Sequence, residues 1–204
     1  MNLTVFGATG RLGRHVLEQG LRRGHKLTAF TRRPQALADP AALAAVVAGD
    51  GRDRQAVRRA IDGADGVIAI VASATRKGPH HTTEVARVIT QAMADRGVRR
   101  LVVTDPYPIV GDRPRLPIWL MRRFLAAAYA DARTMEQVVS STDLDWTIVR
   151  LNRLLDKPAR GTAHVSRDLL AKPSSITRAD AAAILLDAVE DHALAKAAVN
   201  VSGT

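Results

Sequence analysis

Three glycines at three-residue intervals lie near the start of the chain, in the segment GATGRLG that runs from Gly7 through Gly10 to Gly13. A β-prone run precedes them at residues 2–6, and an amphipathic helical pattern follows. The first glycine permits a sharp exit from the strand, the second keeps side-chain atoms away from a bound phosphate, and the third lets the helix pack closely on the sheet. Backbone N–H groups at such a helix N-terminus bind a pyrophosphate. The motif predicts a dinucleotide site formed by Gly7, Thr9, Gly10, Arg11, Leu12 and Gly13. The alternative is a glycine-rich turn that binds no ligand.

The end of the second predicted strand, residues 26–31, bears on which dinucleotide is bound. A site for NAD commonly has Asp or Glu about 20 residues after the glycines, where it accepts hydrogen bonds from the ribose. This chain has Thr31-Arg32-Arg33-Pro34 there, without a carboxylate. A guanidinium donates hydrogen bonds in a planar fork that suits a 2′-phosphate. We therefore expect NADPH (NADP) as the cofactor, with Arg32 as its main selecting residue and Thr31 and Arg33 in support. Solvated surface arginines are the alternative.

Strands and helices alternate along the remaining sequence. The pattern predicts strands at residues 45–49, 66–72, 99–104, 145–150 and 197–201, and helices at 52–61, 82–96, 116–140 and 178–190. Such alternation indicates βαβ units, and hence an α/β fold with a doubly wound parallel sheet, the NAD(P)-binding Rossmann fold. We expect a single domain over residues 1–204, with a small substrate-side region at its C-terminal end, at about 150–204.

Ligands of such sheets lie beyond the carboxyl ends of the strands. This rule turns the strand ends into a list of candidate cofactor contacts, each of which has an ordinary loop residue as its alternative. The candidates are Asp50 and Gly51 for the adenine end, Val71, Ala72 and Ser73 for the ribose and pyrophosphate, and Thr104, Asp105 and Pro106 beside the nicotinamide.

Several segments, in chain order, carry a resemblance to a known superfamily: GATGRLG, GHKLTAFTRRP, GDGRD, DGVIAIVAS, GVRRLVV, LDWTIVR and ITRADAA. Together they resemble the atypical short-chain dehydrogenases/reductases, in particular the NmrA-like and the biliverdin-reductase-B and flavin-reductase-like NAD(P)-binding proteins. The resemblance covers residues 1 to about 201. It implies a Rossmann fold, NADPH, and either the reduction of flavins, quinones or tetrapyrroles or redox sensing without turnover.

The chain departs from these relatives where their chemistry takes place. Ordinary short-chain dehydrogenases use a Tyr-x-x-x-Lys pair, whereas here Tyr129 is followed by Arg133, a match that we interpret as coincidence. Members of the resembling branch usually carry Ser-Ser or Thr-Ser after the fifth strand, where this chain has Asp105-Pro106. An ionised Asp105 accepts hydrogen bonds but donates none, and its charge would favour the oxidised nicotinamide. A nicotinamide anchor, a proton relay and a dead site all remain open. The branch's Arg-Pro after the sixth strand is also altered, to Arg150-Leu151.

Hydride transfer to a flavin or quinone requires little more than the proximity and orientation of two rings. We therefore expect an enzyme, an NADPH-dependent oxidoreductase that reduces a flat conjugated acceptor such as a flavin or quinone. Asp105 and Tyr107 are its candidate catalytic residues, although packing of Tyr107 between Pro106 and Pro108 is the favoured alternative for that side chain. Two other functions stay open: a non-catalytic NADP(H)-sensing NmrA-like regulator, and a ketoreductase-type biosynthetic enzyme.

Composition limits the partners. The formal charge is +10, but the arginines are scattered in pairs and aromatic residues make up only 3%, which argues against nucleic-acid binding. The absence of cysteine excludes disulfides and thiolate chemistry. The sequence shows neither a secretory leader nor an apolar run of membrane length, so we expect a cytoplasmic protein without membrane contact. We expect a small-molecule conjugated substrate, a monomer or homodimer, and no metal, since His80, His81 and Glu84 lack a further ligand at motif spacing.

Overall fold

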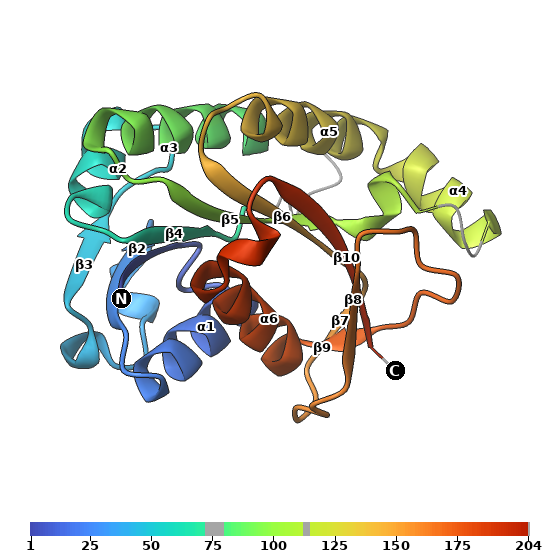
Figure 1. Cartoon of the computed structure of the whole chain (residues 1–204), viewed down its shortest axis with the longest axis horizontal. Coiled ribbons are helices and arrows are strands. Elements are labelled where there is room, and N and C mark those ends of the chain that lie inside the picture. Colours follow the sequence, from blue (N-terminus) through green and yellow to red (C-terminus); the bar gives the residue numbers. More distant parts are fainter. Residues whose placement is uncertain (72–79, 112–114, 204) are drawn as a thin grey trace.

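The computed structural model of the chain describes residues 1–71, 80–111 and 115–203 (Figure 1). Its centre is an eight-stranded sheet with the strand order β3-β2-β1-β4-β5-β6-β10-β8. Neighbouring strands run parallel except at one edge, where β8 pairs antiparallel with β10. The strands are β1 (Asn2–Phe6), β2 (Lys26–Thr31), β3 (Ala45–Ala48), β4 (Gly66–Ala69), β5 (Arg100–Pro106), β6 (Asp145–Leu151), β8 (Ala163–Ser166) and β10 (Ala197–Gly203). Two short strands, β7 (Leu154–Leu155) and β9 (Ile176–Thr177), form a separate parallel pair.

Helices cover both faces of the large sheet (Figure 1). One face carries α1 (Arg11–Arg22) and α6 (Arg178–Glu190), and the other carries α2 (Arg54–Ile61), α3 (Thr82–Arg96) and α5 (Ala126–Ser140). Each face has its own hydrophobic core. Successive residues of β5 point to opposite faces, so Val102 belongs to the core under α1 and α6, whereas Leu101 and Val103 belong to the other core. The predicted doubly wound α/β fold is confirmed.

Three details of the fold correct the sequence-based prediction. The sheet is mostly but not wholly parallel, because β8 adds an antiparallel edge strand. The helix predicted at residues 116–140 is two helices, α4 (Arg115–Phe124) and α5, which meet at Leu125. Arg122 ties α4 to the 3₁₀ turn after β5, since its guanidinium donates to the carbonyls of Pro108, Ile109 and Gly111 at 2.9–3.2 Å. Helix α4 runs in a different direction from α5 (Figure 1). Strand β4 ends at Ala69 instead of residue 72.

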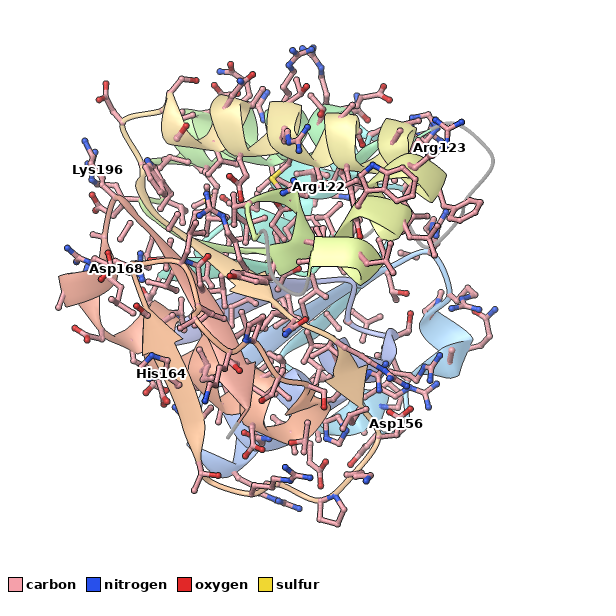
Figure 2. All side chains as sticks on the ribbon, turned by 90° about the vertical axis from the view of Figure 1, so that its right-hand side faces the viewer. Arg122, Arg123, Asp156, His164, Asp168 and Lys196 are labelled. Atoms are coloured by element: carbon pink, nitrogen blue, oxygen red, sulfur yellow. The ribbon has the colours of Figure 1, made fainter. Side chains whose placement is uncertain are left out.

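Figure 2 views the right-hand edge of Figure 1, where α4, β7, β8 and β10 come together. Arg122 lies inward between α4 and α5, whereas Arg123 lies at the outer edge of α4. Helix α4 exposes a row of large apolar side chains, namely Leu116, Trp119, Leu120, Met121 and Phe124. Within the described residues, no helix combines the length and apolar character that crossing a membrane requires.

Candidate active site at the carboxyl ends of the strands

The turn between β1 and α1 accepts only glycine at two of its three glycine positions. Gly7 has a φ of +76°, and a Cβ built there would lie 2.4 Å from the carbonyl oxygen of Ile70, at the end of β4. A Cβ on Gly13 would lie 2.2 Å from the carbonyl oxygen of Gly7. Gly10 is less crowded, with its nearest contact at 3.1 Å, and its N–H donates to the Gly7 carbonyl at 2.9 Å. Glycine at positions 7 and 13 thus brings the turn and the helix against the sheet.

The N-terminus of α1 has the properties of an anion site. Gly10 is its N-cap residue, and among the described residues no side chain caps the helix and no acidic residue lies in its first turn. Backbone N–H groups of a first helical turn have no partner within the helix, and the helix dipole adds positive potential there. These features fit the pyrophosphate of a dinucleotide.

Two residues of the glycine segment have side chains with different surroundings. Leu12 is buried in the core under α1. Arg11 is exposed and its guanidinium lies 2.9 Å from the carboxylate of Asp156, which also binds Arg178 at 2.5 Å. Hydrogen bonding from Arg11 and the charges of both arginines hold the pKa of Asp156 below its usual value. Asp156 lies just after β7, at the lower right of Figure 2.

Thr9 and Thr31 connect the glycine turn to the end of β2. Their hydroxyl oxygens are 2.8 Å apart, and the backbone N–H of Arg33 donates to the Thr31 hydroxyl at 3.0 Å. Thr31 is buried, whereas Arg32 and Arg33 are exposed. The charge of Arg32 contributes to lowering the pKa of Asp50, so its guanidinium lies near the end of β3. The two arginines follow the carboxyl end of β2 and are exposed, and their contact with a 2′-phosphate stays a prediction.

Asp50 follows β3 and is held by a neighbouring arginine. Arg52 binds its carboxylate in a fork, with Nε 2.9 Å from Oδ1 and Nη2 3.1 Å from Oδ2. This hydrogen bonding lowers the pKa of Asp50 to about 2. Gly51 faces Val85 of α3, whose Cγ1 would lie 2.8 Å from a Cβ on the glycine. Contact of Asp50 and Gly51 with an adenine stays a prediction.

A buried acid lies at the end of β5, on the side of the sheet that α5 covers. Asp105 is 5% exposed and stands opposite Arg150 in the register of β5 and β6. The guanidinium of Arg150 binds Glu136 of α5 instead, through Nε–Oε1 and Nη2–Oε2 bonds of 2.7 Å each. Within the described part of the chain, Oδ2 of Asp105 has no hydrogen-bond partner.

The surroundings of Asp105 favour its neutral form. Burial raises its pKa, as do hydrogen bonding with Glu136 and the negative charge of Glu136, to about 9 in all. The charge of Arg150 acts in the opposite direction but with a smaller effect, and Asp131 adds to the increase. These surroundings favour the protonated form of Asp105 at neutral pH, whereas the sequence analysis considered its ionised form. A neutral carboxyl can donate a hydrogen bond as well as accept one.

Tyr107 lies two residues after Asp105 in the chain, and its exposed fraction is 1%. Its hydroxyl oxygen accepts a hydrogen bond of 3.0 Å from the backbone N–H of Leu170, and its ring packs against Gly111. This arrangement favours the packing interpretation, and a catalytic role for Tyr107 stays a prediction. Tyr129 is also buried, in a small cluster with Ile109. Arg133 donates to the carbonyl of Ile109 at 3.2 Å.

The remaining strand-end candidates are divided. Thr104 is buried and Pro106 half-buried at the end of β5. Val71 is half-buried and packs on the core between the sheet and α3. Ala72 and Ser73 lie outside the described residues. The sequence-based prediction missed Glu136, although its position beside the buried Met135 on a helix that packs on the sheet was the available signal.

Comparisons with known proteins bear on the family and the fold of the chain. A family model for NAD(P)H-binding proteins matches residues 7–192. Sterol demethylase protein B of Methylococcus capsulatus is 34% identical over 122 residues, which are 56% of this chain and 37% of that protein. The chain thus spans little more than a third of the length of that curated relative.

Solved structures share the fold over the whole chain. ChuY, an anaerobillin reductase from Escherichia coli O157:H7, is 22% identical with a TM-score of 0.81, covering 100% of this chain and 97% of ChuY. A short-chain dehydrogenase/reductase from Veillonella parvula, solved in complex with NADP, is 16% identical with a TM-score of 0.83, covering 98% of this chain and 94% of that one. The predicted Rossmann fold and nicotinamide cofactor are confirmed: the chain belongs to the family of NAD(P)H-binding proteins.

Proposed function

We propose that this protein is an NADPH-dependent oxidoreductase that reduces a flat conjugated acceptor, such as a flavin or quinone. One observation carries the proposal: the uncapped N-terminus of α1 follows β1, and the buried acid Asp105 is the second-last residue of β5, so both lie at the carboxyl ends of strands in one sheet, where ligands of this fold bind. The site therefore offers a cofactor cradle and one polar group at its nicotinamide end.

Bound NADPH would supply a hydride. Gly7, Gly10 and Gly13, with the N–H groups of α1, would hold its pyrophosphate. Arg32, supported by Arg33 and Thr31, would bind the 2′-phosphate, and the exposure of Arg32 and Arg33 supports this role. Asp50 and Gly51 would contact the adenine end, and Val71, Thr104 and Pro106 would line the path to the nicotinamide.

The available side chains favour hydride transfer to a conjugated ring over alcohol oxidation. Alcohol oxidation requires a positioned base, whereas Tyr129 is buried in a cluster with Ile109 and the exposed Arg133 donates to the Ile109 carbonyl. Transfer between two rings depends mainly on their proximity and orientation. ChuY shares this fold and is an anaerobillin reductase, which supports this class of acceptor by analogy of fold. Residues 150–204 would form the substrate side of a single domain.

Two other functions have support of their own. The replacement of serine by Asp105-Pro106 favours an NADP(H)-sensing regulator that does not turn over. The protonated state of Asp105 favours a ketoreductase-type enzyme, because a neutral acid can give a proton to a carbonyl oxygen. Acceptor-dependent consumption of NADPH separates the first alternative from a reductase, and comparison of quinone or flavin with simple ketones separates the second.

We further propose that the protein acts in the cytoplasm as a monomer or a homodimer. The exposed apolar side chains of α4 would be buried in a homodimer and would stay exposed in a monomer. Light scattering of the wild-type protein and of the Trp119→Glu variant tests this point: a dimer through α4 dissociates in the variant, whereas a monomer keeps its mass.

A further inference from the structure

Asp105, the buried acid at the end of β5, is not needed to bind the cofactor at the N-terminus of α1, so it is available for another chemical role. We infer that Asp105 is the proton donor to the acceptor, with Glu136 as the positioning residue that keeps it neutral by binding the guanidinium of Arg150. This inference rests on the proposed function, because it assigns the second half of the same reduction.

The geometry of the three side chains separates their roles. Arg150 is the only one of the three with a positive charge, and both of its hydrogen bonds to Glu136 are 2.7 Å long. The side chains of Glu136 and Arg150 are 13% and 16% exposed, so this ion pair is shielded from water. Because the charge of Arg150 is matched by Glu136, an ionised Asp105 would be an unmatched buried charge, which costs several kcal/mol.

One carboxyl oxygen of Asp105, the buried Oδ2, has no hydrogen-bond partner among the described residues. Buried polar atoms are nearly always paired, so an orphan calls for an explanation such as a ligand atom. An acceptor nitrogen or oxygen is a suitable partner: the neutral carboxyl has one proton, which it shares with Glu136 until an acceptor at Oδ2 takes it. Among the described residues, the charged groups that act on the pKa of Asp105 are Glu136 and Asp131 from α5 and Arg150 from β6.

The proton transfer balances the reduction. As the acceptor takes a hydride, the O–H bond of Asp105 breaks and its proton forms an N–H or O–H bond on the acceptor. Asp105 is left as a carboxylate, whose negative charge compensates the positive charge of the oxidised nicotinamide. Water then returns a proton to the carboxylate. The substrate class is therefore a conjugated acceptor that gains its proton on nitrogen or oxygen.

The first test measures the protonation state of Asp105 without turnover. Ordinary carboxyl groups are ionised at neutral pH, so an infrared carbonyl-stretch band of a protonated carboxyl at pH 7 would come from Asp105. We expect this band in the wild-type protein, its loss as the pH rises through about 9, and its absence in Asp105→Asn. In Glu136→Gln, Arg150 is free to pair with Asp105, so the band should be lost at neutral pH. Absence of the band from the wild-type protein would overturn the inference.

The second test locates Asp105 relative to the nicotinamide. The same titration is performed with bound NADP⁺ and with bound NADPH. A nearby positive ring should lower the pKa of Asp105 in the NADP⁺ complex by about one unit or more relative to the NADPH complex. Equal pKa values in the two complexes would overturn the placement, whether or not an acceptor has been found.

The third test is kinetic. Asp105→Asn keeps the size and a donor group but has no transferable proton, so acceptor reduction should fall about 100-fold with an unchanged KM for NADPH. The wild-type rate should decline as the pH rises through about 9, and the variant should lose this dependence. Wild-type rates in Asp105→Asn would overturn the inference while leaving the reductase proposal intact. Failure of the wild-type protein to reduce any acceptor would instead contradict the proposed function.

Discussion

Asp105 and Arg150 stand opposite each other in the register of β5 and β6, yet the guanidinium of Arg150 is bound in a fork by Glu136. Asp105 therefore has a cationic neighbour on the adjacent strand, but that cation forms its ion pair with Glu136 and not with Asp105. This relationship explains why burial and Glu136 prevail over Arg150 and raise the pKa of Asp105 to about 9. Asp105 stands where the resembling branch has serine, and in its neutral form it can also donate a proton.

Replacing Asp105 should change how stability depends on pH. The folded-state pKa, about 9, lies above the ordinary value of 3.8, so the stabilising contribution is complete below pH 3.8 and is lost as the pH rises toward 9. Asp105→Asn removes this loss. We expect the variant to gain more than about 1.4 kcal/mol in free energy of unfolding relative to wild type between pH 5 and pH 9, the equivalent of one pKa unit. Urea unfolding at both pH values measures it, and parallel pH dependence of the two proteins would contradict it.

The two crowded glycines should behave differently from the third. Gly13→Ala places a Cβ 2.2 Å from a backbone oxygen, so the helix must shift and the protein should lose stability as well as cofactor affinity. Gly10→Ala, with its nearest contact at 3.1 Å, should fold with little loss of stability. Its methyl group would still crowd a bound pyrophosphate and weaken NADPH binding. Thermal unfolding and NADPH titration of both variants check this, and unimpaired binding by Gly10→Ala would contradict the placement of the phosphates.

Cofactor selection should depend on Arg32. Arg32→Glu removes a positive charge at the expected 2′-phosphate and introduces a negative one, so the affinity for NADPH should fall at least tenfold more than the affinity for NADH, a difference of about 1.4 kcal/mol. Arg33→Glu is the matched control, with the same charge change one residue away and a smaller expected effect. Equal losses for both cofactors in Arg32→Glu would show that this guanidinium does not read the 2′-phosphate.

Two adjacent arginines at the start of β5, Arg99 and Arg100, allow a matched test of which hydrogen bonds stabilise the fold there. Arg100 is 2% exposed and donates to the carbonyls of Asp145, Ala188 and Asp191. Arg99 is exposed and pairs with the Asp145 carboxylate at the surface. Arg100→Met should cost about 3 kcal/mol or more, because it leaves several buried carbonyls unpaired. Arg99→Met should cost less than about 1 kcal/mol. Urea unfolding measures both, and similar losses would contradict this assignment.

The sequence predicted the elements whose signals are local. Alternating apolar runs and the glycine turn located β1, β2 and α1, and the apolar run at 66–72 located β4, although the strand ends at Ala69. The edge strand β8 was missed because it is short (Ala163–Ser166), and its partly exposed residues show no apolar periodicity. The break between α4 and α5 was missed because no glycine or proline marks it. Next to the break, Arg122 of α4 donates hydrogen bonds to a turn that precedes the helix in the chain, a contact that no local pattern records.

The candidate site was predicted in part for the same reason. The strand-end rule selected Asp105, and the altered Arg-Pro motif after the sixth strand pointed to Arg150. The protonation of Asp105 depends on Glu136, which lies 31 residues away in the sequence and reaches the site only through the packing of α5 on the sheet. Likewise, the bonding of Tyr107 to Leu170 joins residues 63 positions apart. Such contacts set pKa values and side-chain roles, and no local pattern records them.

The most direct test of the proposed function is NADPH consumption by the purified protein, followed by the loss of nicotinamide absorbance, with FMN, riboflavin and a simple quinone offered in turn. An NADPH binding titration is run on the same sample. We expect saturable binding together with consumption that depends on one of these acceptors. Saturable binding without consumption would contradict the reductase and favour the NADP(H)-sensing regulator, whereas absence of binding would contradict the cofactor site itself.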